Sequence, residues 1–147
     1  MLHLSASNNI IYKYKGRFSD RYIGRKRVKG DNNMPFIGSK VSVKTTDTQK
    51  EELKKRLGQA IAILPGKSER WLMVELEDEK KLYFGGDDSA PSAYITVSIL
   101  GNPDSASFTK MTGEICNIYS EILGISPDRI YIKYDTTKDW GWNGSNF

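Results

Sequence analysis

The chain has 147 residues, including 22 Lys/Arg, 18 Asp/Glu and one His, which give a formal net charge of +4 at pH 7. This length is typical of one domain. The lone Cys116 excludes an intramolecular disulfide, and because His3 is the only histidine, catalytic or zinc sites built on histidine are excluded from the rest of the chain. No apolar stretch is long enough to span a membrane, and residues 1–6 lack the apolar run of a secretory signal.

The excess positive charge lies in residues 1–34, which we interpret as a basic leader. Residues 1–33 contain eight Lys/Arg and two Asp/Glu, whereas residues 34–147 contain 14 and 16, so their net charges are +6 and −2. A transit peptide, a nucleic-acid or nuclear-entry segment built on residues 25–29, and a segment that is disordered or absent from the mature protein all fit this composition. We favour the last, which leaves residues 35–147 as the folded domain.

The first half of this domain predicts the order strand, helix, strand. Residues 36–43 alternate as a strand does. Residues 48–51 match a capping box, and the helix that follows ends at Pro65-Gly66. Its apolar positions recur at spacings of three and four: Leu53, Leu57, Ala60, Ile61 and Leu64. Residues 71–76 predict a second strand, and residues 81–84 a short extra strand closed by two glycines.

The second half repeats this order. Residues 93–100 are almost continuously apolar, which predicts a central strand, and residues 102–104 predict a turn and a helix start. One helical face then carries Phe108, Met111, Ile115, Ile118 and Ile122. Gly124 follows where a helix commonly ends in the left-handed conformation, and residues 130–134 predict the last strand.

Two successive βαβ units predict an α+β fold with two layers. In this arrangement the four strands form one mixed sheet and both helices cover one of its faces. We expect the other face to be bare and apolar. Such a face requires a partner, most simply identical subunits related by symmetry.

Six short segments stand out by their order and spacing, namely residues 34–37, 65–67, 83–86, 98–101, 125–132 and 141–147. Together they resemble the macrophage migration inhibitory factor family, which includes D-dopachrome tautomerase. The resemblance covers all of residues 35–147 and none of the leader.

This resemblance implies a homotrimer with three active sites at subunit interfaces. It also implies keto–enol tautomerase activity on small aromatic ketoacid-like substrates such as phenylpyruvate and dopachrome, with no metal or organic cofactor. The family includes cytokine-like members that leave cells without a signal peptide. We therefore expect a cytoplasmic location, an extracellular one, or both, and leave a cell-surface receptor open as a partner. Nucleic acid and membranes are not expected partners.

By the same resemblance, Pro35 is the catalytic base once its amine is free, and Lys67 binds the substrate carboxylate and lowers the pKa of that amine. An α-amino group titrates near 7.7–8.0, and burial or a nearby cation lowers its pKa. Ser98 and Ile99 match the segment that offers a backbone N–H, and Tyr131 the tyrosine that reaches in from a neighbouring subunit. Five aromatic residues are expected to form the pocket wall or the subunit seam: Phe36, Trp71, Trp140, Trp142 and Phe147.

Three features depart from the family pattern. Lys133 stands where many members have Asn, and a second cation there favours carboxylate substrates. Residues 91–94 replace the Cys-x-x-Cys pair of some members, so thiol oxidoreductase activity is not expected. The leader, while attached, makes the Pro35 nitrogen a tertiary amide that cannot act as a base. Two alternatives therefore stay open: a non-catalytic, cytokine-like binding protein, and a nucleic-acid or organelle-directed variant that uses the leader.

Overall fold

The structure is a computed structural model that describes residues 34–146. The predictions for residues 1–33 and for Phe147 lie outside this range. None of the helices in the described range is both long and apolar enough to cross a membrane.

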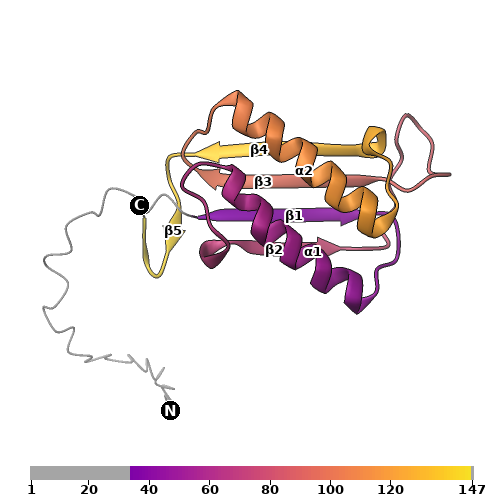
Figure 1. Cartoon of the computed structure of the whole chain (residues 1–147), viewed down its shortest axis with the longest axis horizontal. Helices are drawn as coiled ribbons and strands as arrows, with labels where there is room; N and C mark the ends of the chain where they lie inside the picture. The colour runs from indigo at the N-terminus through magenta and orange to yellow at the C-terminus, as the bar shows by residue number, and fades with distance from the viewer. Residues whose placement is uncertain (1–33, 147) are drawn as a thin grey trace, which may run out of the picture.

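Four strands and two helices build the domain (Figure 1). The strands of the main sheet are β1 (Pro35–Val41), β2 (Met73–Glu77), β3 (Ala93–Leu100) and β4 (Ile130–Thr137), and the helices are α1 (Asp47–Ala60) and α2 (Ser105–Leu123). Short 3₁₀ turns cover Ile61–Ile63, Glu69–Trp71 and Pro127–Arg129, and a small hairpin pairs β5 (Gly141–Trp142) with β6 (Ser145–Asn146).

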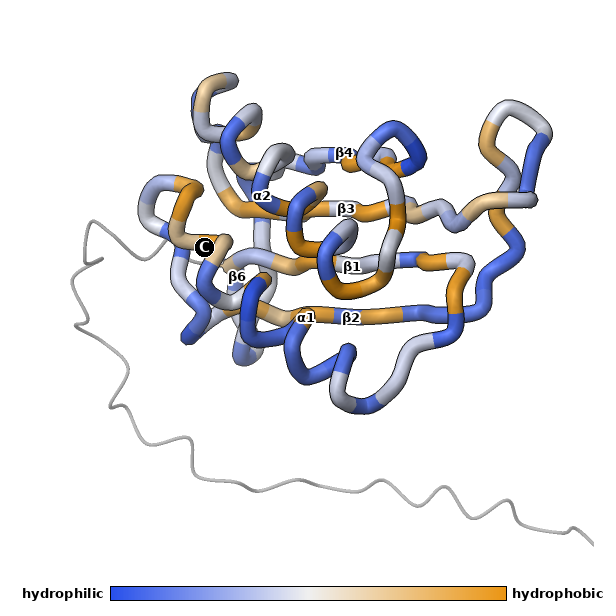
Figure 2. The backbone as a smooth tube through the Cα atoms, turned by 45° about the vertical axis from the view of Figure 1, so that its right-hand side comes forward, coloured by the Kyte–Doolittle hydropathy of each residue, from blue (hydrophilic) through white to orange (hydrophobic). Residues whose placement is uncertain are grey.

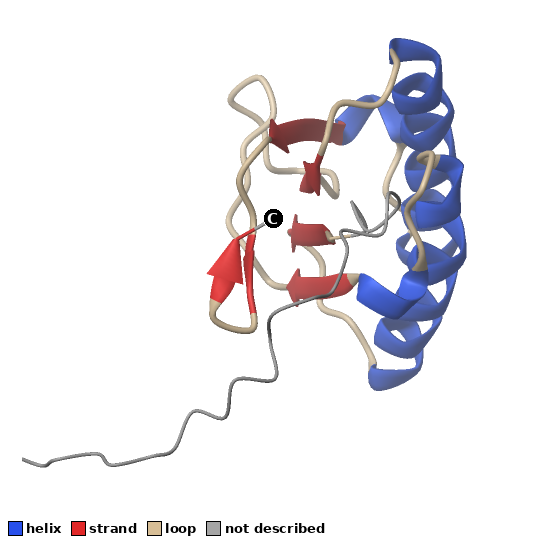
Figure 3. Ribbon diagram, turned by 90° about the vertical axis from the view of Figure 1, so that its left-hand side faces the viewer, coloured by secondary structure: helices blue, strands red, loops and turns tan. Residues whose placement is uncertain are grey.

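The sheet has the strand order β2-β1-β3-β4. β1 and β2 run parallel, as do β3 and β4, and the two pairs meet along the antiparallel contact of β1 with β3. Both helices stand on one side of this sheet (Figure 3). The predicted four-stranded mixed sheet with two helices on one face is therefore confirmed, as is the central place of β3, along which hydrophobic residues run in Figure 2.

The helices begin and end at sequence signals, although the capping box of α1 lies two residues earlier than predicted. The capping box of α1 is formed by Thr46 and Gln49, not by residues 48–51: the Gln49 N–H donates to the Thr46 hydroxyl, and the Gln49 side chain accepts from the Thr46 N–H. α2 begins after Asp104, whose carboxylate accepts from the Ser107 N–H. It ends at Gly124, which has φ 67° as predicted.

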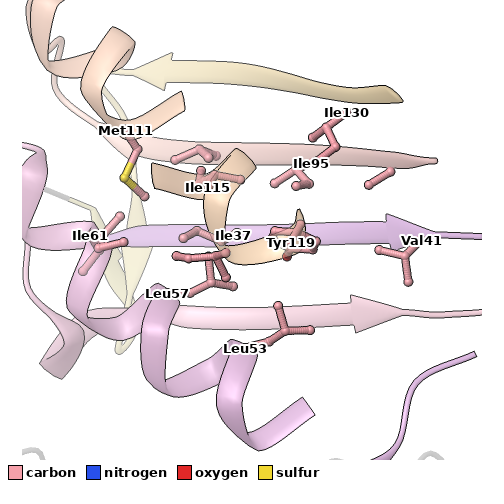
Figure 4. Close-up of a cluster of buried hydrophobic side chains, with 14 of the residues drawn as sticks. Ile37, Val41, Leu53, Leu57, Ile61, Ile95, Met111, Ile115, Tyr119 and Ile130 are labelled. Atoms are coloured by element: carbon pink, nitrogen blue, oxygen red, sulfur yellow. The ribbon is translucent and has the colours of Figure 1, made fainter. Parts of the chain in front are cut away.

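The core lies between the sheet and the two helices. Alternate residues of β1 and β3, such as Ile37 and Ile95, are fully buried against α1 and α2 (Figure 4). Ser39 and Tyr119 are buried with them as a polar pair, and a hydrogen bond between their hydroxyls satisfies both groups. Burial raises the pKa of Tyr119 to about 12, although the hydrogen bond from Ser39 acts in the opposite direction.

The second face of the sheet carries no helix, as predicted, but the prediction that this face is apolar is wrong. Side chains alternate along each strand, so the residues between the buried ones point to the face that carries no helix. Large apolar side chains are a minority on it. Its members are Phe36, Gly38 and Lys40 of β1, Met73, Glu75 and Glu77 of β2, Tyr94, Thr96 and Ser98 of β3, and Tyr131, Lys133 and Asp135 of β4.

The predicted strand at residues 81–84 is also wrong. Phe84 and Asp87 exchange two backbone hydrogen bonds of 2.8 and 3.1 Å around Gly85 and Gly86. Both glycines have positive φ, 58° and 82°, as the central residues of a type I′ turn require. The segment makes a tight turn because no strand of the sheet lies beside it to complete a ladder.

Candidate active site

Each of the four strands of the sheet has one of its ends at the same edge of the domain. β1 and β2 begin there, since Phe36 pairs with Met73, and β3 and β4 end there, since Ile99 pairs with Thr136. The β5–β6 hairpin lies beside the same edge (Figure 1). Segments far apart in the sequence therefore meet at the amino end of β1.

A pocket of about 900 Å³ opens at this edge. Its lining comes from the strand ends, the 3₁₀ turn at Glu69–Trp71, and the β5–β6 hairpin with the segment before it. Its lining consists of Met34, Pro35, Phe36, Arg70, Trp71, Leu72, Met73, Ser98, Asp135, Thr136, Thr137, Asp139, Trp140, Gly141 and Trp142.

Pro35 is the first residue of β1 and is buried in the lining of this pocket. Proline fits the first position of a strand because it has no N–H to donate to a ladder. Its partner across the antiparallel contact is Ile99. In the described chain Met34 precedes it and is only 6% exposed.

Lys67 follows the turn at Gly66, which has φ 75°, and its side chain is only 7% exposed. The Lys67 ammonium donates a 2.6 Å hydrogen bond to the carbonyl of Leu100, the residue after Ile99. Burial lowers the pKa of Lys67 from its usual 10.5, because the charged form loses hydration. Lys67 is therefore attached to the strand end that faces Pro35, but it is not part of the pocket lining.

Aromatic side chains form much of the pocket wall. Trp71 and Trp142 meet edge to face with ring centroids 5.3 Å apart, a favourable geometry for two π systems. Phe36 and Trp140 also line the pocket. Four of the five aromatic residues expected here thus lie in the wall, and Phe147 lies outside the described residues.

Ser98 and Ile99 occupy opposite faces at the end of β3. Ser98 lines the pocket, whereas the Ile99 side chain is fully buried in the core. Ile99 pairs with Pro35 across the antiparallel contact, so its backbone lies beside Pro35.

Tyr131 and Lys133 do not line the pocket of their own chain. Tyr131 pairs with Tyr94 at the far end of the sheet, five residues before Thr136, or about 16 Å along the strand. It is 63% exposed and contacts the Phe84 ring at 5.0 Å. Lys133 forms a 3.0 Å ion pair with Asp135, which raises the pKa of Lys133.

Several lining residues were not anticipated from the sequence. Arg70 and Met73 flank the Trp71 segment, and Asp135 and Asp139 flank the end of β4. Trp71 was expected in the pocket because it is aromatic, but its charged neighbour Arg70 was not. The position of Arg70 directly before Trp71 was the signal in the sequence that could have identified it.

Within residues 34–146, no group of three or more His, Cys, Asp or Glu side chains is placed to hold a metal ion.

Comparisons with known proteins place this fold and site in context. Residues 34–147 match the family model described as macrophage migration inhibitory factor (MIF). The macrophage migration inhibitory factor of Meriones unguiculatus is 32% identical over 99 residues, which cover 66% of this chain and 85% of that protein.

Solved structures agree with this match. Leishmania major MIF2 superimposes with a TM-score of 0.72 at 34% identity, over 78% of this chain and 98% of that one. The macrophage migration inhibitory factor homologue of Prochlorococcus marinus gives a TM-score of 0.65 at 29% identity, over 76% and 98%. The similarity therefore covers nearly the whole length of both solved chains and more than three quarters of this one.

Proposed function

Because the chain belongs to the macrophage migration inhibitory factor family, we propose that it is a keto–enol tautomerase of phenylpyruvate-like and dopachrome-like compounds, with Pro35 as its base. The observation that carries this proposal is the place of Pro35, which begins β1 and is buried inside an aromatic-lined pocket. For Pro35 to act, it must be the first residue of the mature protein, since only then is its nitrogen an amine.

The chemistry follows from the surroundings of this nitrogen. Burial and the positive charge of Lys67 both disfavour the protonated amine, so its pKa falls and the neutral base is present near pH 7. In the direction from ketone to enol, the amine removes a proton from the carbon next to the carbonyl, and the enolate oxygen gains a proton. In the direction from enol to ketone, the enol loses its O–H proton to the amine, and the protonated amine delivers a proton to the carbon. A backbone N–H of Ile99 is a suitable donor to the developing oxyanion.

The active protein is a homotrimer in this proposal. Tyr131 lies about 16 Å from the pocket edge of its own chain, so it can serve a pocket only in a neighbouring subunit. β4, which carries Tyr131, and β2, which carries the 68%-exposed Met73, are the two edge strands of the sheet. Each edge strand therefore presents a large exposed side chain to a neighbouring subunit. A contact between unlike edges of successive subunits closes into a ring when the rotation permits.

The test compares three proteins on phenylpyruvate: the chain that begins at Pro35, its Pro35→Gly variant, and the full 147-residue chain. The first should convert enol to ketone, followed by ultraviolet absorbance. The full 147-residue chain has no amine at residue 35 and should be slower by at least about 100-fold, the usual contribution of a positioned base. Pro35→Gly keeps a primary amine but loses the ring that fixes its position, so it should be slower as well. Undiminished turnover in Pro35→Gly would sink the mechanism.

A second candidate function is a non-catalytic, cytokine-like binding protein. The observation that favours it is Met34, which is attached to Pro35 and lines the pocket. If the leader is retained, Pro35 stays an amide and the pocket can only bind. Its location is then extracellular without a signal peptide and its partner a cell-surface receptor, whereas the tautomerase can also act in the cytoplasm.

A further inference from the structure

Arg70 is the only cationic residue in the lining of the pocket within the described part of the chain. The other charged lining residues are Asp135 and Asp139. Asp135 is paired with Lys133 at 3.0 Å. An anionic substrate that enters this pocket therefore meets one arginine and two aspartates, one of which already has a cationic partner.

The Arg70 side chain is held by an aromatic ring. Its guanidinium lies over Trp71, with Cζ 5.1 Å from the ring centroid, a cation–π contact that restrains the side chain. The preceding Glu69 points toward α1, since its carboxyl group fills the space above Gly58. The two neighbouring charges of this 3₁₀ turn thus lie on different sides of it.

Arg70 differs from the other two arginines of the domain. Arg56 is paired with Glu114 and Glu121, and Arg129 is paired with Asp87. Among the described residues, no carboxylate lies within ion-pair distance of Arg70, although Asp135 and Asp139 line the same pocket. Its guanidinium can therefore take a carboxylate from outside the chain.

Lys67 is placed differently. Its ammonium is bonded to the Leu100 carbonyl, and its side chain is buried outside the pocket lining. From this position the Lys67 charge can lower the pKa of the Pro35 amine without touching the substrate, because a charge acts at a distance whereas a hydrogen bond requires contact.

The geometry points to Arg70 as the residue that binds the carboxylate of an aryl-substituted carboxylic acid, with the aryl group packed against the Trp71–Trp142 pair. This inference rests on the proposed function, and it moves the first contact with the substrate carboxylate from Lys67 to Arg70. A guanidinium meets a carboxylate with two parallel N–H···O bonds, which fix its orientation as well as its place. Arg70 is thus a specificity-determining residue that selects acids over neutral analogues.

The test uses the full 147-residue chain and a pair of probes that cannot tautomerise, 3-phenylpropanoate and its amide 3-phenylpropanamide. They share the aryl group and differ in charge. Calorimetric titration should show that the carboxylate binds at least about tenfold more tightly than the amide. Arg70→Gln should remove this preference and leave amide binding unchanged.

Three control variants sharpen the result. Lys55→Gln removes a cation from the exposed face of α1 and should keep the preference. Arg70→Lys should keep only part of it, because an ammonium lacks the planar fork. Asp139→Asn should strengthen carboxylate binding by a few-fold, because it removes an opposing charge from the pocket.

The outcomes are decisive. Equal or undetectable binding of both probes by the full chain would overturn the inference, as would a preference that survives Arg70→Gln but disappears in Lys67→Met. In the chain that begins at Pro35, Arg70→Gln should raise KM for phenylpyruvate about tenfold with little change in kcat. A parent that prefers the carboxylate probe but turns over no phenylpyruvate would contradict the tautomerase proposal and leave the role of Arg70 intact.

Discussion

At the scale of single residues, Lys67 illustrates two opposing effects of burial. Its ammonium has lost most of its water, which lowers its pKa, yet it donates to the Leu100 carbonyl at 2.6 Å. A buried cation that is held in this way costs stability in its charged form. In return, it brings a positive charge to the strand end that faces Pro35.

Lys67→Met should therefore change how stability depends on pH. The folded-state pKa of Lys67 lies below the unfolded value of 10.5, so between these two values the unfolded chain binds more protons. The free energy of unfolding of the parent should then rise, relative to that of Lys67→Met, as the pH increases through this window. Urea unfolding of both proteins at pH 7 and pH 10 measures the change. A constant difference would show that the lysine titrates alike in both states, and Lys55→Met is the control for removing an exposed charge.

The residue identities of the pocket were largely accessible from the sequence. Pro35, Phe36, Trp71, Ser98 and Trp142 were all named in advance and all line the pocket. These residues lie in or beside short motifs of the family, so their place in the pocket could be expected from the sequence. Arg70 and Asp139 were not named, since their charges gain a role only when the turn and the hairpin meet at one edge.

At the scale of elements, two residues on the helix-free face of β1, Phe36 and Gly38, link the packing of the strand to the shape of the pocket. A Cβ built on Gly38 would lie 2.8 and 3.0 Å from the Phe36 ring. The strand thus has a glycine where the neighbouring pocket-wall ring needs room. This glycine weakens the strand slightly, because it has the most conformational freedom to lose.

Gly38→Ala should displace the Phe36 ring and weaken probe binding in the pocket by roughly tenfold. The free energy of unfolding should change by no more than about 1 kcal/mol, since alanine suits an extended backbone. In a Phe36→Leu background, which has no ring to displace, the same substitution should have little effect on binding. Calorimetric titration of the four proteins of this cycle measures the coupling, and equal losses in both backgrounds would contradict the account.

Element boundaries were harder to predict than elements. The residues at 46–49 and 48–51 both offer a threonine followed three residues later by Gln or Glu, so the sequence does not decide between two capping boxes. The segment at 81–84 has the apolar and aromatic content of a strand, but a strand also needs a neighbour. The pairing of Phe84 with Asp87 shows that the chain turns back on itself instead.

At the scale of the whole molecule, the polar character of the helix-free sheet face removes one reason to expect an oligomer. Residues 93–100 are almost continuously apolar in sequence, but Tyr94, Thr96 and Ser98 alternate with the buried positions. Because that face is largely polar, burial of an apolar face does not explain oligomerisation. The case for a trimer rests instead on the family and on the distance of Tyr131 from its own pocket.

The chain that begins at Pro35 should therefore have three times the mass of one subunit by light scattering at micromolar concentration. A sharper measurement mixes Pro35→Gly with Tyr131→Ala in one refolding. Neither variant alone should be active, but mixed trimers place an intact Pro35 beside an intact Tyr131 and should recover about a quarter of the sites. No recovery from a trimeric mixture would contradict the sharing of sites.

The central claim is that the working protein has a free Pro35 amine. The most direct measurement is the N-terminal residue of the protein isolated from its own cells, by intact mass and N-terminal sequencing. The account predicts Pro35 as the first residue. A first residue at Met34 or earlier would leave the nitrogen an amide, contradict the tautomerase, and favour the binding protein.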